Sequence, residues 1–306
     1  MAAPAPPSFT RFDPKVLTAL EGLDLKARYV MEGFLAGLHE SPFHGFSVEF
    51  SEYRDYQPGD DLRHLDWRLY ARSDRLCVKR YTLETNAHFY ILCDTSGSMV
   101  YRGADAWGSK LDVARTLAAA LTWLLLRQND AVGLITLEGG ADSVPAFIRP
   151  SQKPSQLSLL LKQLEAQRPA GSERLAALLS HATRLIHRRS AVLFFSDLLE
   201  PSGSIARGFK ELRFLGHDCM IFQVLDRDEV EFPFADASEF EDLESGLRRM
   251  VSPHAVRQRY LERFDAFMSE HRNLFQRLEM PHCVVRTDND PYRALMMFLV
   301  ERKRLL

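Results

Sequence analysis

Five consecutive residues, Asp94 to Ser98, carry the side chains best suited to chemistry in this sequence of 306 residues. They read DTSGS, so that the carboxylate of Asp94 and the hydroxyls of Ser96 and Ser98 alternate along the chain. Alternating side chains can point at one place, and Gly97 lets the backbone turn without a Cβ clash. Magnesium prefers octahedral oxygen ligands and usually keeps several waters. The loop therefore predicts a site for Mg²⁺, with Mn²⁺ or Ca²⁺ as alternatives.

A second carboxylate stands at the end of another apolar run. The stretch AVLFFSD ends at Asp197, just as the stretch HFYILCD ends at Asp94. In open α/β sheets, ligands bind beyond the carboxyl ends of the strands. We therefore expect the two loops to converge on one crevice, with Asp197 close to the DTSGS loop.

From His88 onward, strand-like and helix-like segments alternate, which predicts a parallel sheet with helices on both faces. The runs AVLFFSD and DCMIFQVL are almost wholly apolar, as expected for strands covered on both faces. The fold class is therefore α/β, with a doubly wound, mostly parallel, Rossmann-like sheet. The expected strands are 88–94, 131–137, 191–197, 218–225 and 282–287, with a hairpin at 142–149. The expected helices are 108–127, 154–165, 173–188, 204–215, 253–278 and 291–303.

The first 86 residues follow a different pattern. Apolar spacing predicts one or two helices from Pro14 to Leu38, and alternating stretches between Ser47 and Glu84 predict a small β-rich part. We therefore divide the chain into a smaller N-terminal helical and β-rich module, 1–86, and an α/β domain, 87–306. Within this domain an acidic stretch predicts an inserted hairpin near 228–250.

Composition and charge exclude several classes of protein. The formal net charge is −2 and the pI is about 6.6, so no basic field draws the chain to nucleic acid. No apolar run reaches the roughly 18 residues of a membrane span, and the first residues lack the apolar core of a secretory signal. We therefore expect a cytoplasmic protein. The four cysteines show no metal-ligand spacing and are expected to be mostly buried, inert thiols.

The stretch DTSGSM resembles the DxSxS metal-ion-dependent adhesion site of von Willebrand A domains, and Asp197 resembles the later strand-end Asp of that site. The family also has a Thr on an intervening loop. Here the nearest match is Ser172, which departs from that Thr. The resemblance implies a metal held by Asp94, Ser96, Ser98, Ser172 and Asp197.

A longer stretch upstream, YRDYQPGDDLRHLDW at 53–67, resembles the signature of the bacterial domain-of-unknown-function 58 family. That family couples such a module to a von Willebrand A-like half. Its members often accompany MoxR-type AAA+ ATPases. The resemblance therefore implies an adaptor or chaperone-like role beside an ATPase of this type.

The predicted function is metal-dependent binding of a protein, in which the metal accepts an acidic side chain of the partner as its last ligand. The partner implied by the family resemblance is a MoxR-type ATPase or its client. The sequence lacks GxSxG, HExxH and GxxxxGK[ST] motifs, and we expect no enzyme. Two alternatives remain open. One is a magnesium-dependent, phosphatase-like hydrolase with Asp94 as nucleophile, and the other is a metal-free scaffold in which the loop only caps the next helix.

Overall fold

The computed structural model describes residues 12–40, 53–55, 77–79, 87–138, 144–169, 175–236, 238–243 and 246–302. Within these ranges the strands are β1 (Tyr53–Asp55), β2 (Cys77–Lys79), β3 (His88–Cys93), β4 (Ala131–Glu138), β5 (Val144–Ser151), β6 (Ala191–Ser196), β7 (Asp218–Leu225), β8 (Ser238–Glu241), β9 (Arg248–Val251) and β10 (His282–Arg286). The helices are α1 (Pro14–Ala19), α2 (Leu23–Glu40), the 3₁₀ helix η2 (Gly97–Val100), α4 (Lys110–Arg127), α5 (Ser155–Ala166), α6 (Leu175–Leu185), α7 (Ser202–Phe214), α8 (Arg227–Glu231), α9 (Pro253–Arg277) and α10 (Tyr292–Arg302).

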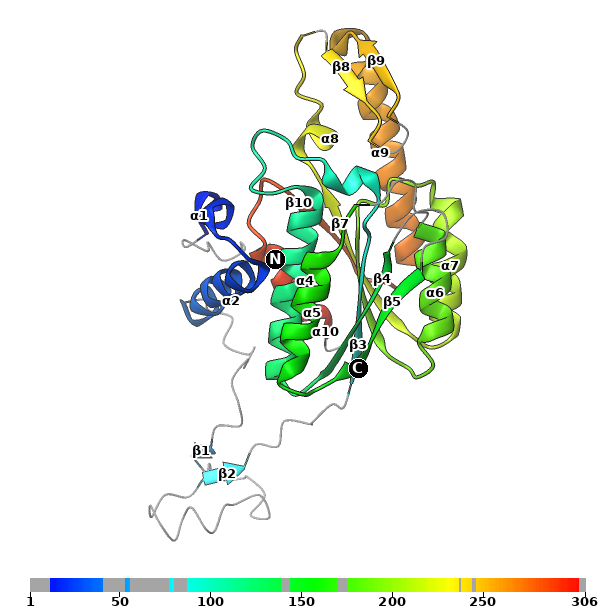
Figure 1. Ribbon diagram of the computed structural model, residues 1–306. Coiled ribbons are helices and arrows are strands. Elements are labelled where there is room, and N and C mark those ends of the chain that lie inside the picture. Colours follow the sequence, from blue (N-terminus) through cyan, green and yellow to red (C-terminus); the bar gives the residue numbers. More distant parts are fainter. Residues whose placement is uncertain are drawn as a thin grey trace, which may run out of the picture.

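Six of the strands form one sheet in the order β10-β7-β6-β3-β4-β5 (Figure 1). All neighbouring pairs are parallel except β4 and β5, which are antiparallel. This confirms the predicted α/β class with a mostly parallel sheet. The predicted hairpin at 142–149 is wrong in its extent, because β5 is a single strand whose partner is β4. The connection 139–143 between them suits an antiparallel turn and is too short for a parallel crossover.

The strand order reverses between β3 and β6, which are neighbours in the sheet. From β3 the chain moves outward to β4 and β5, and it then returns to β6 and continues outward to β7 and β10. At such a switch point the two following connections leave in opposite directions, and a crevice forms at the carboxyl ends of the strands. Asp94 directly follows β3 and Asp197 directly follows β6. The fold therefore brings both carboxylates to the switch point.

Two hydrophobic cores cover the two faces of the sheet. Alternate side chains of β3 enter them, with Phe89 and Ile91 in one core and Tyr90 and Leu92 in the other. Helices α2, α4, α5 and α10 lie over the first face, and α6, α7 and α9 lie over the second (Figure 1). Each fully buried apolar side chain contributes roughly 1.5–3 kcal/mol, so the two layers hold the strand ends in fixed positions.

Helices α1 and α2 confirm the helical reading of the N-terminal segment. Leu17 and Phe34 are fully buried in the same core as α4, and the ring of Phe34 lies 6.1 Å from that of Tyr292 in α10. Strands β1 and β2 pair in antiparallel register, while most of the expected β-rich stretch 47–84 lies outside the described residues. The boundary between 86 and 87 adjoins residues outside the description, so the division into 1–86 and 87–306 stays a prediction.

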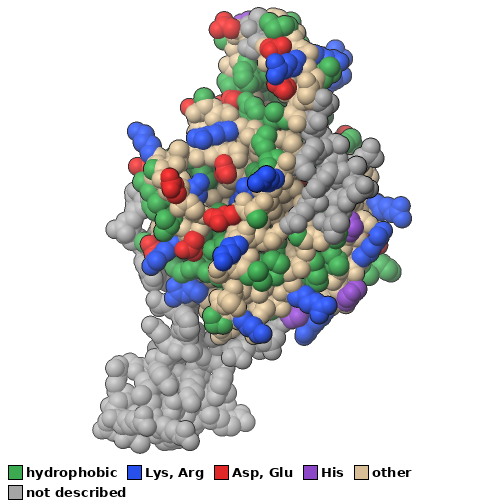
Figure 2. All heavy atoms as spheres, in the orientation of Figure 1, with side chains coloured by type: hydrophobic (Ala, Val, Ile, Leu, Met, Phe, Trp, Pro, Cys, Tyr) green, Lys and Arg blue, Asp and Glu red, His purple; other side chains and the backbone are tan. Residues whose placement is uncertain are grey.

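Strands β8 and β9 pair with each other in a separate two-stranded sheet, within the range where the inserted hairpin is expected. This hairpin and the N-terminal half of α9 project from the body of the molecule (Figure 1). On the visible face, basic and acidic side chains are interspersed (Figure 2). Over the described residues, no helix combines the length and apolar character that a membrane crossing requires.

Candidate metal-binding site

Asp94 lies at the switch point of the sheet and joins the ends of two strands. Its backbone amide donates to the carbonyl of Phe195 at 2.9 Å, which extends the pairing of β3 with β6 by one residue. Its Oδ2 accepts from Ser196 Oγ at 2.7 Å, and its Oδ1 accepts from the backbone amide of Ser96 at 2.9 Å. With 3% of its surface exposed, the carboxylate is fixed in position and almost shielded from bulk water.

The two serines of the loop place their hydroxyls side by side. Ser96 Oγ lies 3.1 Å from Ser98 Oγ. Neighbouring ligands in an octahedral Mg²⁺ shell, with metal–oxygen distances of about 2.1 Å, are about 3.0 Å apart. The spacing of the hydroxyls thus fits two adjacent positions of such a shell. Ser96 is buried and Ser98 is half-buried, so the side of the site at Ser98 faces outward.

Asp197 brings the second carboxylate from the end of β6 and is 1% exposed. Its Oδ1 accepts from the backbone amide of Leu199 at 3.2 Å, and its backbone carbonyl accepts from Gln223 Nε2 at 3.0 Å. Leu198, which follows it, has a φ of 58°, in the left-handed region that a leucine rarely adopts. The Asp197 turn is therefore held in one conformation by its hydrogen bonds.

Burial and mutual repulsion make this pair of carboxylates sensitive to charge. Burial is the largest cause that raises the pKa of Asp94 to about 7, and the neighbouring Asp197 raises it further, against the hydrogen bonds from Ser196 and Ser96. A divalent cation between the two carboxylates would offset both effects and favour the ionised form of Asp94. The donor set of two carboxylates and two hydroxyls is thus suited to a hard cation.

Lys110, the first residue of α4, is a component of the site that sequence reasoning missed. Its side chain is fully buried, and its Nζ donates to Asp197 Oδ2 at 2.7 Å and to Glu229 Oε1 at 2.5 Å. Burial opposes its charge, but Asp197 and Glu229 outweigh burial and raise its pKa above the usual value. A lysine in the first turn of a helix is ordinarily exposed, and Glu229 is distant in sequence, so no local signal marks this residue.

The structure brings together four of the five predicted site residues, Asp94, Ser96, Ser98 and Asp197. Ser172 lies in 170–174, outside the described residues, so its role stays a prediction. Among the residues that are described, no group of three or more His, Cys, Asp or Glu side chains is placed to hold a metal. Any cation at this site would therefore depend on the serine hydroxyls as well as on the carboxylates.

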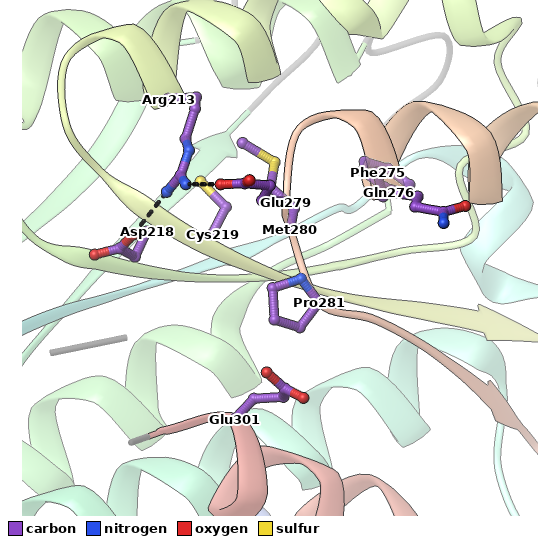
Figure 3. A pocket seen from close by; sticks show the side chains of 9 residues that line it. All are labelled: Arg213, Asp218, Cys219, Phe275, Gln276, Glu279, Met280, Pro281 and Glu301. Atoms are coloured by element: carbon purple, nitrogen blue, oxygen red, sulfur yellow. Dashed lines mark hydrogen bonds and ion pairs between the residues drawn. The ribbon is translucent and has the colours of Figure 1, made fainter. Parts of the chain in front are cut away.

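A cavity of about 530 Å³ lies at the amino end of β7 (Figure 3). Because β6 and β7 are parallel, this is the edge of the sheet opposite the candidate site. Arg213 in this cavity donates to Asp218 at 2.9 Å and to Glu279 at 2.8 Å. Figure 3 shows these three side chains pointing toward one another. The three charged groups are engaged with one another, and the residues that line the cavity include no serine or threonine hydroxyl like those of the candidate site.

Residues 52–273 match the model of the family described as "Protein of unknown function DUF58". The relatives of this chain include two proteins described as uncharacterized, from Mycobacterium bovis and Mycobacterium tuberculosis. Each is 30% identical over 307 residues, which cover 98% of this chain and 94% of the relative. The similarity therefore spans nearly the whole chain, including the segment before β3.

Among solved structures, this chain is similar to BatB from Bacteroides thetaiotaomicron, with 14% identity, a TM-score of 0.45 and coverage of 71% of this chain and 98% of that one. It is also similar to an aerotolerance-related membrane protein from Bacteroides fragilis, with 18% identity, a TM-score of 0.46 and coverage of 70% and 99%. A third similar structure is the SpRpn10 VWA domain, with 12% identity, a TM-score of 0.39 and coverage of 71% and 94%.

Proposed function

We infer the function from the site itself, because the chain belongs to the DUF58 family, which is described as one of unknown function. The proposed function is that of an adaptor that binds another protein through a metal ion. In this proposal Ser96 and Ser98 bind Mg²⁺ directly, Asp94 and Asp197 bind it partly through water, and Ser172 adds a further hydroxyl. An acidic side chain of the partner completes the shell.

The observation that carries this proposal is the pair of serine hydroxyls 3.1 Å apart beside two buried carboxylates at the switch point of the sheet. A cation bound mainly by neutral hydroxyls keeps much of its charge, so it attracts a carboxylate strongly in a site of reduced dielectric. Ser98 is the more exposed of the two serines, and we propose that the partner approaches from its side.

For the partner we propose a MoxR-type AAA+ ATPase or its client. The support for this choice is that residues 53–67 resemble the signature of the DUF58 family, whose members often accompany ATPases of this type. The support for an acidic contact residue comes from the site, because a hard cation prefers oxygen ligands with negative charge. The two parts of the proposal can therefore fail separately.

The phosphatase alternative is disfavoured by the surroundings of Asp94. An attacking carboxylate must reach the phosphorus of its substrate, whereas both oxygens of Asp94 accept hydrogen bonds and the residue is 3% exposed. The metal-free scaffold is the second candidate, because the ammonium of Lys110 already neutralises part of the charge of Asp197. These two candidates and the adaptor differ in their response to metal.

A thermal-shift titration with Mg²⁺ and Mn²⁺ tests the metal. At a hundredfold excess over the Kd, a ligand that binds only the native state stabilises by about 2.7 kcal/mol, which corresponds to a shift of several degrees. We expect this shift in the wild type and in Ser158→Ala, an exposed control serine of α5, but not in Ser98→Ala. An equal shift in Ser98→Ala would contradict the proposed ligand set.

A second experiment tests the partner. Purified MoxR-type ATPase from the same organism should be retained by the immobilised wild-type protein in Mg²⁺ and released by a chelator. Ser98→Ala should retain much less. Retention that is unaffected by the chelator would contradict metal-dependent binding. If the wild type shows the thermal shift with metal but does not retain the ATPase, this choice of partner is contradicted.

A further inference from the structure

The part of the chain that follows β7 forms a compact projection, which we call the arm. It consists of α8, the β8–β9 hairpin and the first half of α9, within residues 227–264 (Figure 1). Its aromatic side chains pack around Phe232, whose ring centroid lies 4.6 Å from Tyr260, 5.1 Å from Phe234 and 5.8 Å from Phe240. These contacts link all parts of the arm, so a movement of α8 is passed on to the hairpin and α9.

The base of the arm is tied to the candidate site through Lys110. Glu229 lies in α8, and its Oε2 accepts from the backbone amide of Asp226 at 2.7 Å, which caps the helix. Its Oε1 accepts from Lys110 Nζ, which also donates to Asp197. The carbonyl of Glu229 accepts from Tyr260 Oη at 2.7 Å. One buried ammonium is thus shared between a carboxylate of the site and the first turn of the arm.

A second set of contacts ties the arm to the segment that follows Ser98. Tyr101 Oη donates to Asp228 Oδ2 at 2.8 Å, and the backbone amide of Gly103 donates to Asp226 Oδ2 at 2.9 Å. A Cβ on Gly103 would lie 2.3 Å from Asp226 Oδ1, so only glycine permits this approach. The loop that follows β3 therefore contacts the base of the arm directly, whereas the Asp197 loop is linked to it through Lys110.

The Asp197 loop and α8, which Lys110 joins, each contain or adjoin a residue with a strained backbone conformation. Leu198, next to Asp197, has a φ of 58°, and Phe232, at the end of α8, has a φ of 46°. Such conformations cost free energy in residues other than glycine and persist only where the surroundings enforce them. Loss of the Lys110 contacts would remove part of that enforcement on each side, so the two segments are suited to change conformation together.

We propose that Lys110 is a positioning residue that couples the candidate site to the arm. A cation at Asp197 competes with the Lys110 ammonium for the same carboxylate. The link that runs from Asp197 through Lys110 to Glu229 is then lost, so the arm is no longer held to the site and is free to engage the partner. This step rests on the proposed function, since it needs a cation at the site. By linkage, a partner that holds the loosened arm would raise the affinity of the site for the cation.

Hydrogen exchange of the metal-free protein tests the bridge itself. In Lys110→Met, we expect peptides of the arm, 227–264, to exchange at least about tenfold faster than in the wild type, at exposure times short enough that β4 and β5 stay protected in both proteins. The matched control is Arg302→Met, which breaks the ion pair between the half-buried Arg302 and the buried Asp130 at the amino end of the sheet. Unchanged exchange of the arm in Lys110→Met, or an equal effect in both variants, would overturn the coupling.

Exchange in saturating Mn²⁺ then tests the competition. In the wild type, Mn²⁺ should slow exchange at 94–100 and accelerate it in the arm. Lys110→Met should keep the first effect and lose the second. Protection at 94–100 without a response of the arm, or the same response in Lys110→Met, would overturn the proposal. No protection at 94–100 in either protein would instead contradict the proposed metal site, and the metal-free comparison would still decide whether Lys110 holds the arm.

Discussion

Asp94 should make the metal-free protein less stable as the pH rises. Its pKa is raised from 3.8 to about 7 in the folded state, first by burial and then by Asp197. The folded protein therefore binds more protons than the unfolded chain between these values, so the free energy of unfolding falls with rising pH. For this shift, the loss between about pH 5 and pH 8 amounts to about 3 kcal/mol.

The measurement is urea unfolding with a chelator at both pH values, in the wild type and in Asp94→Asn. The difference between the two proteins is the informative quantity, because His282 acts in the opposite direction. Burial lowers the pKa of His282 to about 4, so this residue adds stability as the pH rises. The wild type should lose about 3 kcal/mol more than Asp94→Asn over this interval. Equal pH dependence in the two proteins would refute the account of a strained carboxylate pair.

Three further predictions follow from the same residues. Lys110→Met should lower the free energy of unfolding by about 3–5 kcal/mol in chemical denaturation, because it leaves the buried Asp197 and the half-buried Glu229 without their cation. Breaking the exposed Arg28–Glu32 pair should leave the free energy of unfolding unchanged. The apparent affinity for Mn²⁺, measured by calorimetry, should fall about tenfold per pH unit below about pH 7, where Asp94 takes up a proton. Cys93 and Cys219, whose pKa values burial raises to about 12, should react with iodoacetamide at least about a hundredfold more slowly in the native protein than in urea; comparable rates would contradict their burial.

The fold was predictable because its signals are local. Strands β6 and β7 are buried on both faces, and their nearly continuous apolar runs mark them in the sequence. The alternation of strands and helices predicts parallel pairing, and the strand-end rule then puts Asp94 and Asp197 at the same edge of the sheet. Ser196 was missed, although its place as the residue before Asp197 in a buried strand gives some indication of it.

The charged partners of the site were not predictable, because each depends on contacts between distant segments. Lys110 has the sequence context of an exposed lysine, and only the folded chain brings Asp197 and Glu229 to its ammonium. The acidic stretch after Leu225 suggests a solvated hairpin, yet Asp226 is buried and accepts from Thr287 Oγ1 at 2.6 Å. Sequence patterns report the average exposure of a segment, whereas these roles are decided by single long-range contacts.

The most direct test of the central claim is the binding of Mn²⁺ measured by electron paramagnetic resonance, in which bound Mn²⁺ loses the sharp signal of the free ion. The wild type and Ser158→Ala should bind one ion at neutral pH and release it to excess Mg²⁺. Ser98→Ala and Asp94→Ala should bind at least about tenfold more weakly while unfolding at a similar temperature in the absence of metal. Binding of equal strength in all four proteins, or no binding by the folded wild type, would contradict a metal site at the DTSGS loop.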